Sequence, residues 1–221
     1  MNIYKIRFYS TRNLEDKTNG FYCRFGKRYF DLILSIPSLI ILSPIFLITA
    51  ILIKLDTSGP IVFSHERAGR DGKPFKLYKF RTMVKDASKK GLSITPANDP
   101  RVTKIGKVLR KFKMDEMLQI INVVKGDMSV IGPRPEIKKY TDRFKKDYRE
   151  ILKIKPGMTD YALIAFRNEE KILSKFDDIE EGYIKEVLPE KIKLYRKYME
   201  EMGLLTDVKI FLKTVLEILR R

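Results

Sequence analysis

The hydrophobic and polar positions of this chain divide it into one long apolar run and several amphipathic stretches. Residues 32–53 form 22 consecutive positions without a charged side chain, and Lys54 is the first to interrupt the run. As one straight helix this run would extend about 33 Å, which is enough to cross the hydrocarbon core of a bilayer. It starts late and has no small-x-small cleavage site before Lys54, which argues against a cleaved signal peptide.

Two prolines inside the run, Pro37 and Pro44, argue against a plain transmembrane helix. Proline removes a backbone donor and clashes with the preceding turn, so we expect a break or a sharp kink at Ser43-Pro44. A helix broken there forms two legs of roughly 18 Å, which would dip into one leaflet and return both flanks to the same side. A Pro-kinked spanning helix explains the segment equally well, and a buried helix of a soluble protein is a third alternative. Basic residues flank both ends, so they select no orientation.

Shorter patterns predict a hairpin and several helices beyond the apolar run. Two β-like runs, residues 61–64 and 75–82, flank a Gly-Arg-Asp-Gly turn, which is typical of a β-hairpin. Bases alternate with aromatic residues along it, and they include Lys79 and Arg81. A phosphate-binding hairpin and a solvated basic hairpin with one packed face both explain this pattern.

The second half of the chain predicts mostly helices. From Arg101, apolar residues recur at helical spacing with bases on another face, which suits a helix lying at an anionic membrane surface. Residues 136–154 are helical and charged. Residues 168–202 are rich in both charge signs, which predicts solvated peripheral helices. An apolar stripe along residues 204–221 indicates either a surface-lying membrane helix or a core helix.

The charge balance narrows the class of partner. The net charge is +17, whereas residues 168–203 hold ten acids and seven bases, so the excess of bases lies elsewhere. This asymmetry points to a polyanion: nucleic acid, anionic lipid or a phosphorylated substrate. The single cysteine, Cys23, excludes an intrachain disulfide, and with one histidine, His65, it argues against a zinc site. A metal here would be a hard cation on oxygen ligands.

The most informative chemistry lies between residues 101 and 136. Asp115 and Glu116 are the only acids among seven bases between Pro100 and Gly126. They mark either a site for an anionic substrate, with the carboxylates as reacting groups or metal ligands, or simply the first turn of a second helix. The Gly132-Pro133-Arg134-Pro135 loop is stiffened by two prolines and presents Arg134 as a planar fork for phosphate or carboxylate; an ordinary turn with an exposed arginine is the alternative.

These motifs, in this order, resemble the bacterial sugar transferase family, the small monotopic phosphoglycosyl transferases, over residues 24–221. The shared motifs are Lys27-Arg28-Tyr29-Phe30-Asp31, the Ser43-Pro44 break, Tyr78-Lys79-Phe80-Arg81-Thr82-Met83, Asp115-Glu116-Met117-Leu118-Gln119, Lys125-Gly126-Asp127-Met128-Ser129, Gly132-Pro133-Arg134-Pro135 and Lys155-Pro156-Gly157-Met158-Thr159. Several spaced motifs in the right order are more specific than any one of them.

The resemblance implies transfer of a sugar 1-phosphate from a UDP-sugar to polyprenyl phosphate, such as undecaprenyl phosphate, with release of UMP. Asp115 matches the family nucleophile, which forms a phosphosugar-aspartyl intermediate, and Glu116 matches an assisting acid for proton removal or metal positioning. Mg²⁺ would neutralise the diphosphate, with Asp115 as its protein ligand. The bases that match substrate-binding positions are Lys79, Arg81, Arg110, Arg134 and Arg167.

The resemblance also implies a fold and a location. We expect a mainly helical α/β protein, with a re-entrant membrane helix, amphipathic interfacial helices and a small β-hairpin, on the cytoplasmic face of the bacterial inner membrane. We predict a polar extension at residues 1–20, an anchor at 21–56 and a catalytic domain at 57–221. After Thr159 the common family pattern Gly-Trp-Ala-Gln-Val-Asn-Gly-Arg-Asn is replaced by a stretch in which only Ala162, Arg167 and Asn168 agree. An N-acetylated amino sugar is the expected substrate from family habit, and nucleic acid is not an expected partner.

Two other functions remain as hypotheses from different classes. A membrane-tethered nucleic-acid-binding protein would account for the charge, and it predicts a steep salt dependence of DNA or RNA affinity. A noncatalytic membrane scaffold would require that Asp115 and Glu116 be dispensable.

Overall fold

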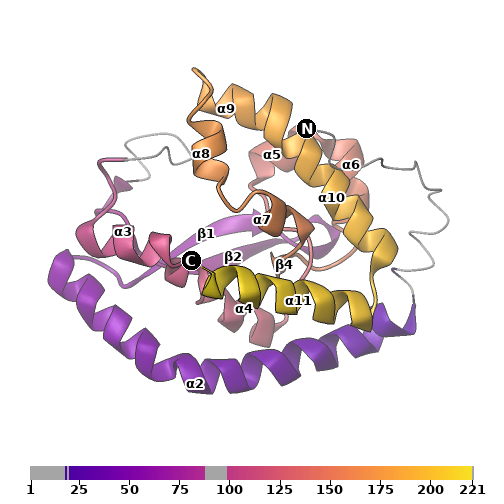
Figure 1. The fold of residues 1–221 in the computed structure, drawn as a ribbon, viewed down its shortest axis with the longest axis horizontal. Helices are drawn as coiled ribbons and strands as arrows, with labels where there is room; N and C mark the ends of the chain where they lie inside the picture. The colour runs from indigo at the N-terminus through magenta and orange to yellow at the C-terminus, as the bar shows by residue number, and fades with distance from the viewer. Residues whose placement is uncertain (1–17, 19, 88–98, 221) are drawn as a thin grey trace.

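The computed structural model describes residues 18, 20–87 and 99–220, so the predicted extension at residues 1–20 falls almost wholly outside it. The described part is mainly helical with two small sheets (Figure 1), in agreement with the expected class. A π-helical turn at Tyr22–Gly26 leads into α2 (Lys27–Asp56). The other helices are α3 (Lys104–Lys111), α4 (Gln119–Lys125), α5 (Lys138–Arg143), α6 (Lys145–Ile151), α7 (Tyr161–Ala165), α8 (Glu169–Leu173), α9 (Ile179–Gly182), α10 (Leu188–Glu201) and α11 (Leu204–Leu219). The strands are β1 (Val62–Ala68), β2 (Pro74–Phe80), β3 (Ser129–Ile131) and β4 (Gly157–Thr159).

The apolar run forms one continuous helix, so the break predicted at Ser43-Pro44 is not present as two separate legs. Figure 1 shows instead that α2 curves along its length. Pro44 has no N–H to pair with the carbonyl of Ile40, and the Ser43 hydroxyl donates to that same carbonyl at 2.7 Å. The side chain therefore satisfies the group that proline leaves unpaired, and the helix can continue past it.

Both ends of α2 are fixed to the rest of the molecule. At its beginning, Lys27 Nζ contacts Asp207 Oδ2 of α11 at 2.7 Å, and Asp31 Oδ1 accepts hydrogen bonds from the Ser129 hydroxyl and the Val130 N–H. At its end, Asp56 Oδ2 accepts from the N–H of Ile105 in α3 at 3.0 Å. Within the described residues, Tyr22–Asp56 is the one helical stretch that is long and apolar enough to cross a membrane.

The two sheets differ in how far the sequence predicts them. Strands β1 and β2 pair antiparallel, from Val62 opposite Phe80 to Ala68 opposite Pro74, which confirms the predicted hairpin. Strands β3 and β4 pair in parallel, which was not predicted. This pairing requires glycine, because a Cβ on Gly157 would lie 2.1 Å from the backbone nitrogen of Gly132.

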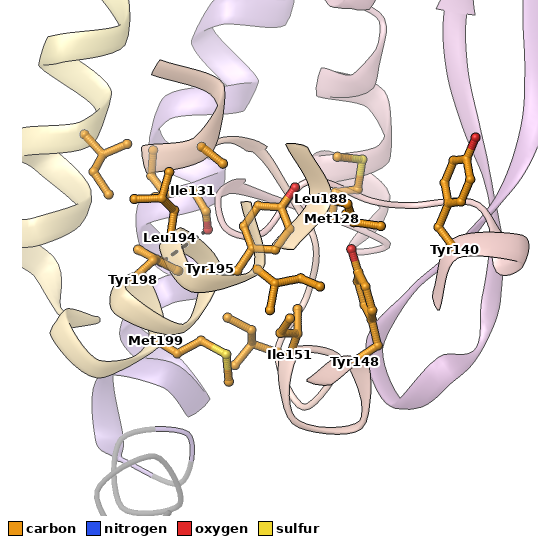
Figure 2. Close-up of a cluster of buried hydrophobic side chains, with 14 of the residues drawn as sticks. Met128, Ile131, Tyr140, Tyr148, Ile151, Leu188, Leu194, Tyr195, Tyr198 and Met199 are labelled. Atoms are coloured by element: carbon orange, nitrogen blue, oxygen red, sulfur yellow. Dashed lines mark hydrogen bonds between the residues drawn. The ribbon is translucent and has the colours of Figure 1, made fainter. Parts of the chain in front are cut away.

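Helix α10 lies in the core, so the prediction of solvated peripheral helices over residues 168–202 was wrong for this part. Figure 2 shows its side chains among those of β3 and α6. Tyr195, Tyr198 and Met199 are fully buried, and the Tyr198 hydroxyl donates to the carbonyl of Ile131 and to Asp207. Apart from the buried Lys191, which pairs with Glu169, the charged residues of α10 lie on its other faces. The high charge content of the segment concealed its apolar stripe.

A broad apolar surface remains exposed on α2 and α11. In Figure 1 the two helices lie along the same side of the molecule. The exposed large apolar residues of α2 are Tyr29, Ile33, Ile36, Ile40, Ile41, Ile45, Leu47, Ile48, Ile51, Leu52 and Leu55, and those of α11 are Leu204, Leu205, Val208, Leu212, Val215, Leu216 and Ile218. Val108 and Phe112, in and just after α3, are also exposed. Exposed apolar surface on this scale marks a site of contact with membrane or protein.

Candidate active site

The two acids lie in a turn of their own between α3 and α4. Helix α3 begins after Thr103, whose side chain accepts a hydrogen bond from the N–H of Gly106, so the helix starts three residues later than the pattern predicted. Lys113 adopts a left-handed conformation with φ 56°, which ends the helical path. Asp115 and Glu116 then follow in a 3-10 turn, Met114–Glu116, and they are not the first turn of α4.

Glu116 is held by two cations from different elements. Lys79 Nζ, on β2, contacts Glu116 Oε1 at 2.8 Å. The guanidinium of Arg134 binds both carboxylate oxygens, with NH1 3.0 Å from Oε2 and NH2 2.5 Å from Oε1. Burial opposes ionisation, but the charges of Arg134 and Lys79 outweigh it and hold the pKa of Glu116 well below its usual range. A carboxylate in this state is a weak base, so the geometry favours a positioning role over proton removal.

Asp115, in contrast to Glu116, is not held by a cation through a hydrogen bond among the described residues. Its side chain is buried, and Oδ1 has no hydrogen-bond partner among the described residues. Burial, and then the charge of Glu116, raise the pKa of Asp115, while Lys79, Lys113 and Arg110 partly offset the rise. When it is ionised, a carboxylate without hydrogen-bond partners on this oxygen is a competent nucleophile.

The structure brings some of the sequence-predicted bases to the acids and places others apart from them. Lys79 and Arg134 bind Glu116 directly, and Arg110 affects the ionisation of Asp115 while its Nε donates to the Thr82 hydroxyl at 2.9 Å. Arg81 points elsewhere. Its buried guanidinium donates to the carbonyls of residues 57 and 58, and so binds the chain that follows α2.

The loop that carries Arg134 is clamped onto β4 and the start of α7. Gly132 N–H donates to the Thr159 carbonyl at 3.0 Å, and Gly157 N–H donates to the Pro133 carbonyl at 2.8 Å. The third contact comes from a side chain: Asp160 Oδ2 accepts from the N–H of Arg134 at 3.2 Å.

Asp160 also caps α7, because its Oδ1 accepts from the N–H of Leu163 at 2.6 Å. Burial raises the pKa of Asp160 to about 6, although these backbone donors and Arg134 oppose the rise. A single buried carboxylate thus fixes both the helix start and the backbone of the arginine that binds Glu116.

His65, on β1, is a half-buried group that the sequence-based site did not include. Its Nε2 accepts a hydrogen bond from Arg67 Nε at 2.6 Å, and its Nδ1 is buried without a partner among the described residues. Burial, followed by the charges of Arg67, Lys79 and Arg134, lowers the pKa of His65 to about 3. The imidazole is therefore neutral beside the cationic cluster, where it adds no further positive charge.

A cavity of about 320 Å³ adjoins the cluster. Its charged lining residues are Lys113, Glu116, Arg134, Arg167, Glu169, Lys191 and Glu217, so Arg167 lines the same cavity as Arg134. Arg167 is also paired with Glu217 of α11. The remaining wall is mainly apolar and comes from α2, α4, α7 and α11, including Leu34, Leu42, Ile120, Leu163, Phe211 and Val215.

The donor set limits what metal the site could hold. In the described parts of the chain, no group of three His, Cys, Asp or Glu side chains is arranged to bind a metal ion. Glu116 is occupied by Lys79 and Arg134, whereas Asp115 keeps one oxygen unpartnered. This arrangement fits a cation such as Mg²⁺ that takes one carboxylate from the protein and its other ligands from substrate phosphate and water.

Sequence analysis did not assign roles to Asp160, His65 or Lys113. Asp160 stands where the common family pattern has glycine, and the spacing from Asp160 to Leu163 is a recognisable helix cap. The departure itself was therefore the available signal. Nothing local in the sequence marks His65, because two of the cations that lower its pKa, Lys79 and Arg134, come from β2 and from the loop after β3.

Comparisons with known proteins place this geometry among related sequences. The profile described as bacterial sugar transferase matches residues 22–221. The chain is 35% identical over 202 residues to a UDP-N-acetylgalactosamine-undecaprenyl-phosphate N-acetylgalactosaminephosphotransferase of Aeromonas hydrophila, covering 88% of this chain and 44% of that protein. It is 35% identical over 196 residues to a UDP-glucose:undecaprenyl-phosphate glucose-1-phosphate transferase of Escherichia coli K12, covering 87% of this chain and 40% of that protein. It is 31% identical to the exopolysaccharide production protein ExoY of Sinorhizobium fredii over 205 residues, covering 86% and 84%. The chain spans less than half the length of the first two relatives.

Proposed function

This chain belongs to the bacterial sugar transferase family, and we propose that it transfers a sugar 1-phosphate from a UDP-sugar to polyprenyl phosphate, which begins the synthesis of a glycoconjugate. The observation that carries the proposal is the pair of adjacent acids in opposite states. Asp115 has a buried, unpartnered oxygen, while Glu116 is bound by Lys79 and Arg134. Family membership favours this function over nucleic-acid binding.

The proposed reaction has two displacements at one phosphorus atom. In the first, an oxygen of Asp115 attacks the phosphorus that carries the sugar, the bond from that phosphorus to UMP breaks, and UMP leaves. In the second, an oxygen of polyprenyl phosphate attacks the same phosphorus and the bond to Asp115 breaks, which regenerates the carboxylate. When Asp115 is ionised, both nucleophiles are anions, so neither step requires a general base. This agrees with a Glu116 whose pKa is held low.

The cations around the acids supply the binding groups that this reaction needs. Arg110, Lys113 and Arg134 surround Asp115 and Glu116, and each can approach a phosphate oxygen. Glu116 keeps Arg134 in place, so the guanidinium does not need to reorganise when the diphosphate binds. Mg²⁺, held by Asp115 and the diphosphate, would neutralise charge on the leaving group when bound. Because Glu116 is bound by Lys79 and Arg134, Asp115 is the protein carboxylate left for that ion.

The acceptor and the location follow from the exposed apolar surface. Polyprenyl phosphate lies in a membrane, and α2, α3 and α11 carry apolar side chains that water would not favour. Because both ends of α2 contact the same folded unit, we propose that the curved helix enters one leaflet and returns, rather than crossing the bilayer. The catalytic groups would then face the cytoplasm, where UDP-sugars are found.

The sugar is the least determined part of the proposal. One relative is named for N-acetylgalactosamine and another for glucose, at the same identity to this chain. We propose an N-acetylated amino sugar. Release of UMP from a panel of UDP-sugars with undecaprenyl phosphate would identify the substrate directly.

The nucleophile is tested by Asp115→Asn, which keeps the shape of the side chain and removes its charge. We expect turnover to fall by roughly 10³-fold or more, because the amide oxygen is a poor nucleophile. UMP release measures turnover, and mass spectrometry of enzyme mixed with UDP-sugar alone measures the covalent phosphosugar adduct.

The matched control is Asp142→Asn, an exposed carboxylate paired with Lys138 on α5. It should behave as the unmodified protein in both assays. Melting temperatures should be similar for all three proteins. Turnover or adduct formation retained in Asp115→Asn would reject the assignment of Asp115.

A further inference from the structure

The cavity beside the acids is lined by charged residues and by a mainly apolar wall. The charged residues are Lys113, Glu116, Arg134, Arg167, Glu169, Lys191 and Glu217, of which Glu116 pairs with Arg134, Glu217 with Arg167 and Glu169 with Lys191. The apolar wall includes Leu34 and Leu42 of α2, Leu163 of α7, and Phe211 and Val215 of α11. A ligand that matches this wall carries an anionic group at one end and a hydrocarbon body behind it.

The helices that enclose the cavity also carry the exposed apolar surface. One face of α2 and α11 lines the cavity, and other faces expose residues such as Ile41 and Leu205. A hydrocarbon chain that leaves the cavity between these helices would therefore meet apolar side chains rather than water. The cavity and the exposed surface form one continuous environment for a lipid chain.

We propose that this cavity binds the isoprenoid phosphate acceptor, with its phosphate at Arg134, Lys113 and Arg167 and its first isoprene units between α2, α7 and α11. This inference rests on the proposed function. Of the two substrates, only the acceptor combines an anion with an apolar chain, because a UDP-sugar is polar along its whole length. The apolar wall therefore separates the acceptor from the donor.

The experiment compares Val215→Trp with Leu216→Trp, two neighbouring substitutions on α11. Val215 lines the cavity, and Leu216 does not line it and is half-exposed. We expect Val215→Trp to raise the KM for undecaprenyl phosphate by about tenfold, because the indole occupies space needed by the chain. The KM for the UDP-sugar should not change in either variant, and Leu216→Trp should retain the original KM for the acceptor.

A second measurement does not depend on any substitution. Unmodified protein in detergent is irradiated with a benzophenone-bearing farnesyl phosphate, and the cross-linked peptides are identified by mass spectrometry. Cross-links should fall on α7, α11 and residues 34–42 of α2, and unlabelled undecaprenyl phosphate should compete with them. Cross-links confined to the outer faces of α2 and α11 would overturn the proposal.

The outcomes separate this inference from the proposed function. If the unmodified protein releases no UMP from any UDP-sugar, the proposed function fails. If it releases UMP and the two tryptophan variants show the same KM for the acceptor, only the cavity assignment fails. An increase in the KM for the UDP-sugar with Val215→Trp would instead place the donor in the cavity.

Discussion

The turn that carries Asp115 and the loop that carries Arg134 differ in whether their charged side chain has a partner. The turn leaves a carboxylate oxygen buried without a partner, at a cost that the fold must compensate. The loop does the reverse, because its arginine is bound to both oxygens of Glu116 and its backbone is bound by Asp160. One region keeps a reactive group free, and the other keeps a binding group fixed.

This difference explains why two adjacent acids can have different roles. Burial raises the pKa of Asp115, whereas Arg134 and Lys79 overcome burial at Glu116 and lower its pKa. Divergent environments of neighbouring titratable groups are typical of catalytic sites. The comparison predicts that damage to the fixed region should reduce activity even though it leaves Asp115 itself unchanged.

Within the loop that carries Arg134, the largest effect on activity is expected from Arg134→Ala, which breaks the ion pair with Glu116. This change leaves Glu116 with Lys79 as its cation and removes a phosphate-binding group, so we expect kcat/KM to fall by roughly 10²- to 10³-fold. Loss of one partner of a partly buried ion pair should also lower the free energy of unfolding by about 2 kcal/mol. Steady-state UMP release and denaturant unfolding measure the two effects.

Two further variants separate charge from geometry. Arg134→Lys keeps the positive charge but loses the planar fork, and an activity between those of Arg134→Ala and the unmodified protein is expected. Arg196→Ala removes an arginine that also contacts two carboxylates, Asp147 and Glu150, away from the cavity. If this control lost as much activity as Arg134→Ala, the ion pair between Arg134 and Glu116 would have no special role.

A smaller effect on activity is expected from Asp160→Asn, which weakens the contact between Asp160 and the backbone of Arg134. The amide keeps one acceptor but places a donor toward one of the two backbone N–H groups that Asp160 binds. We expect kcat to fall by roughly tenfold, because Arg134 shifts away from its position against Glu116. Asp178→Asn is the matched control, since Asp178 caps α9 in the same manner without contacting the site.

The same variant tests the buried charge of Asp160 through its pH dependence. The pKa of Asp160 is raised to about 6 in the folded chain, against about 3.9 in an unfolded one. A raised pKa gives stability that is complete below the unfolded value and is lost as pH rises through the folded value. Between pH 5 and pH 7 the unmodified protein should therefore lose about 1 kcal/mol of unfolding free energy relative to Asp160→Asn. A pH-independent difference between the two proteins would show that Asp160 is not ionising in this range.

The sequence predicted the free region better than the fixed one. The isolation of Asp115 and Glu116 among bases is a local pattern, and so is the antiparallel hairpin that brings Lys79 to them. The contact between Asp160 and the Arg134 loop depends instead on β3 and β4. These are two strands of three residues each, which pair in parallel across 25 intervening residues. No periodicity is visible in strands so short, and the contact between Asp160 and Arg134 exists only after they pair.

Helices α2 and α10 show why composition alone did not predict packing. Helix α2 is apolar on nearly all sides and is mostly exposed, whereas α10 is rich in charge and lies in the core. A residue's burial depends on which face it occupies and on which solvent covers the other faces. For α2, we propose that the surrounding solvent is lipid. The long apolar run in the sequence indicates this, whereas the rule that apolar residues are buried from water would place α2 in the core.

The smallest effect on activity is expected at Arg81, which the sequence placed with the substrate-binding bases. It follows Lys79 by two residues, yet its guanidinium donates to the carbonyls of Thr57 and Ser58 instead of reaching Glu116. Arg81→Lys should therefore lower the free energy of unfolding by about 1–2 kcal/mol through loss of these hydrogen bonds. The KM for the UDP-sugar should stay the same, in contrast to Arg134→Lys. A raised KM without a loss of stability would return Arg81 to the substrate-binding cations and extend the fixed region beyond the clamp.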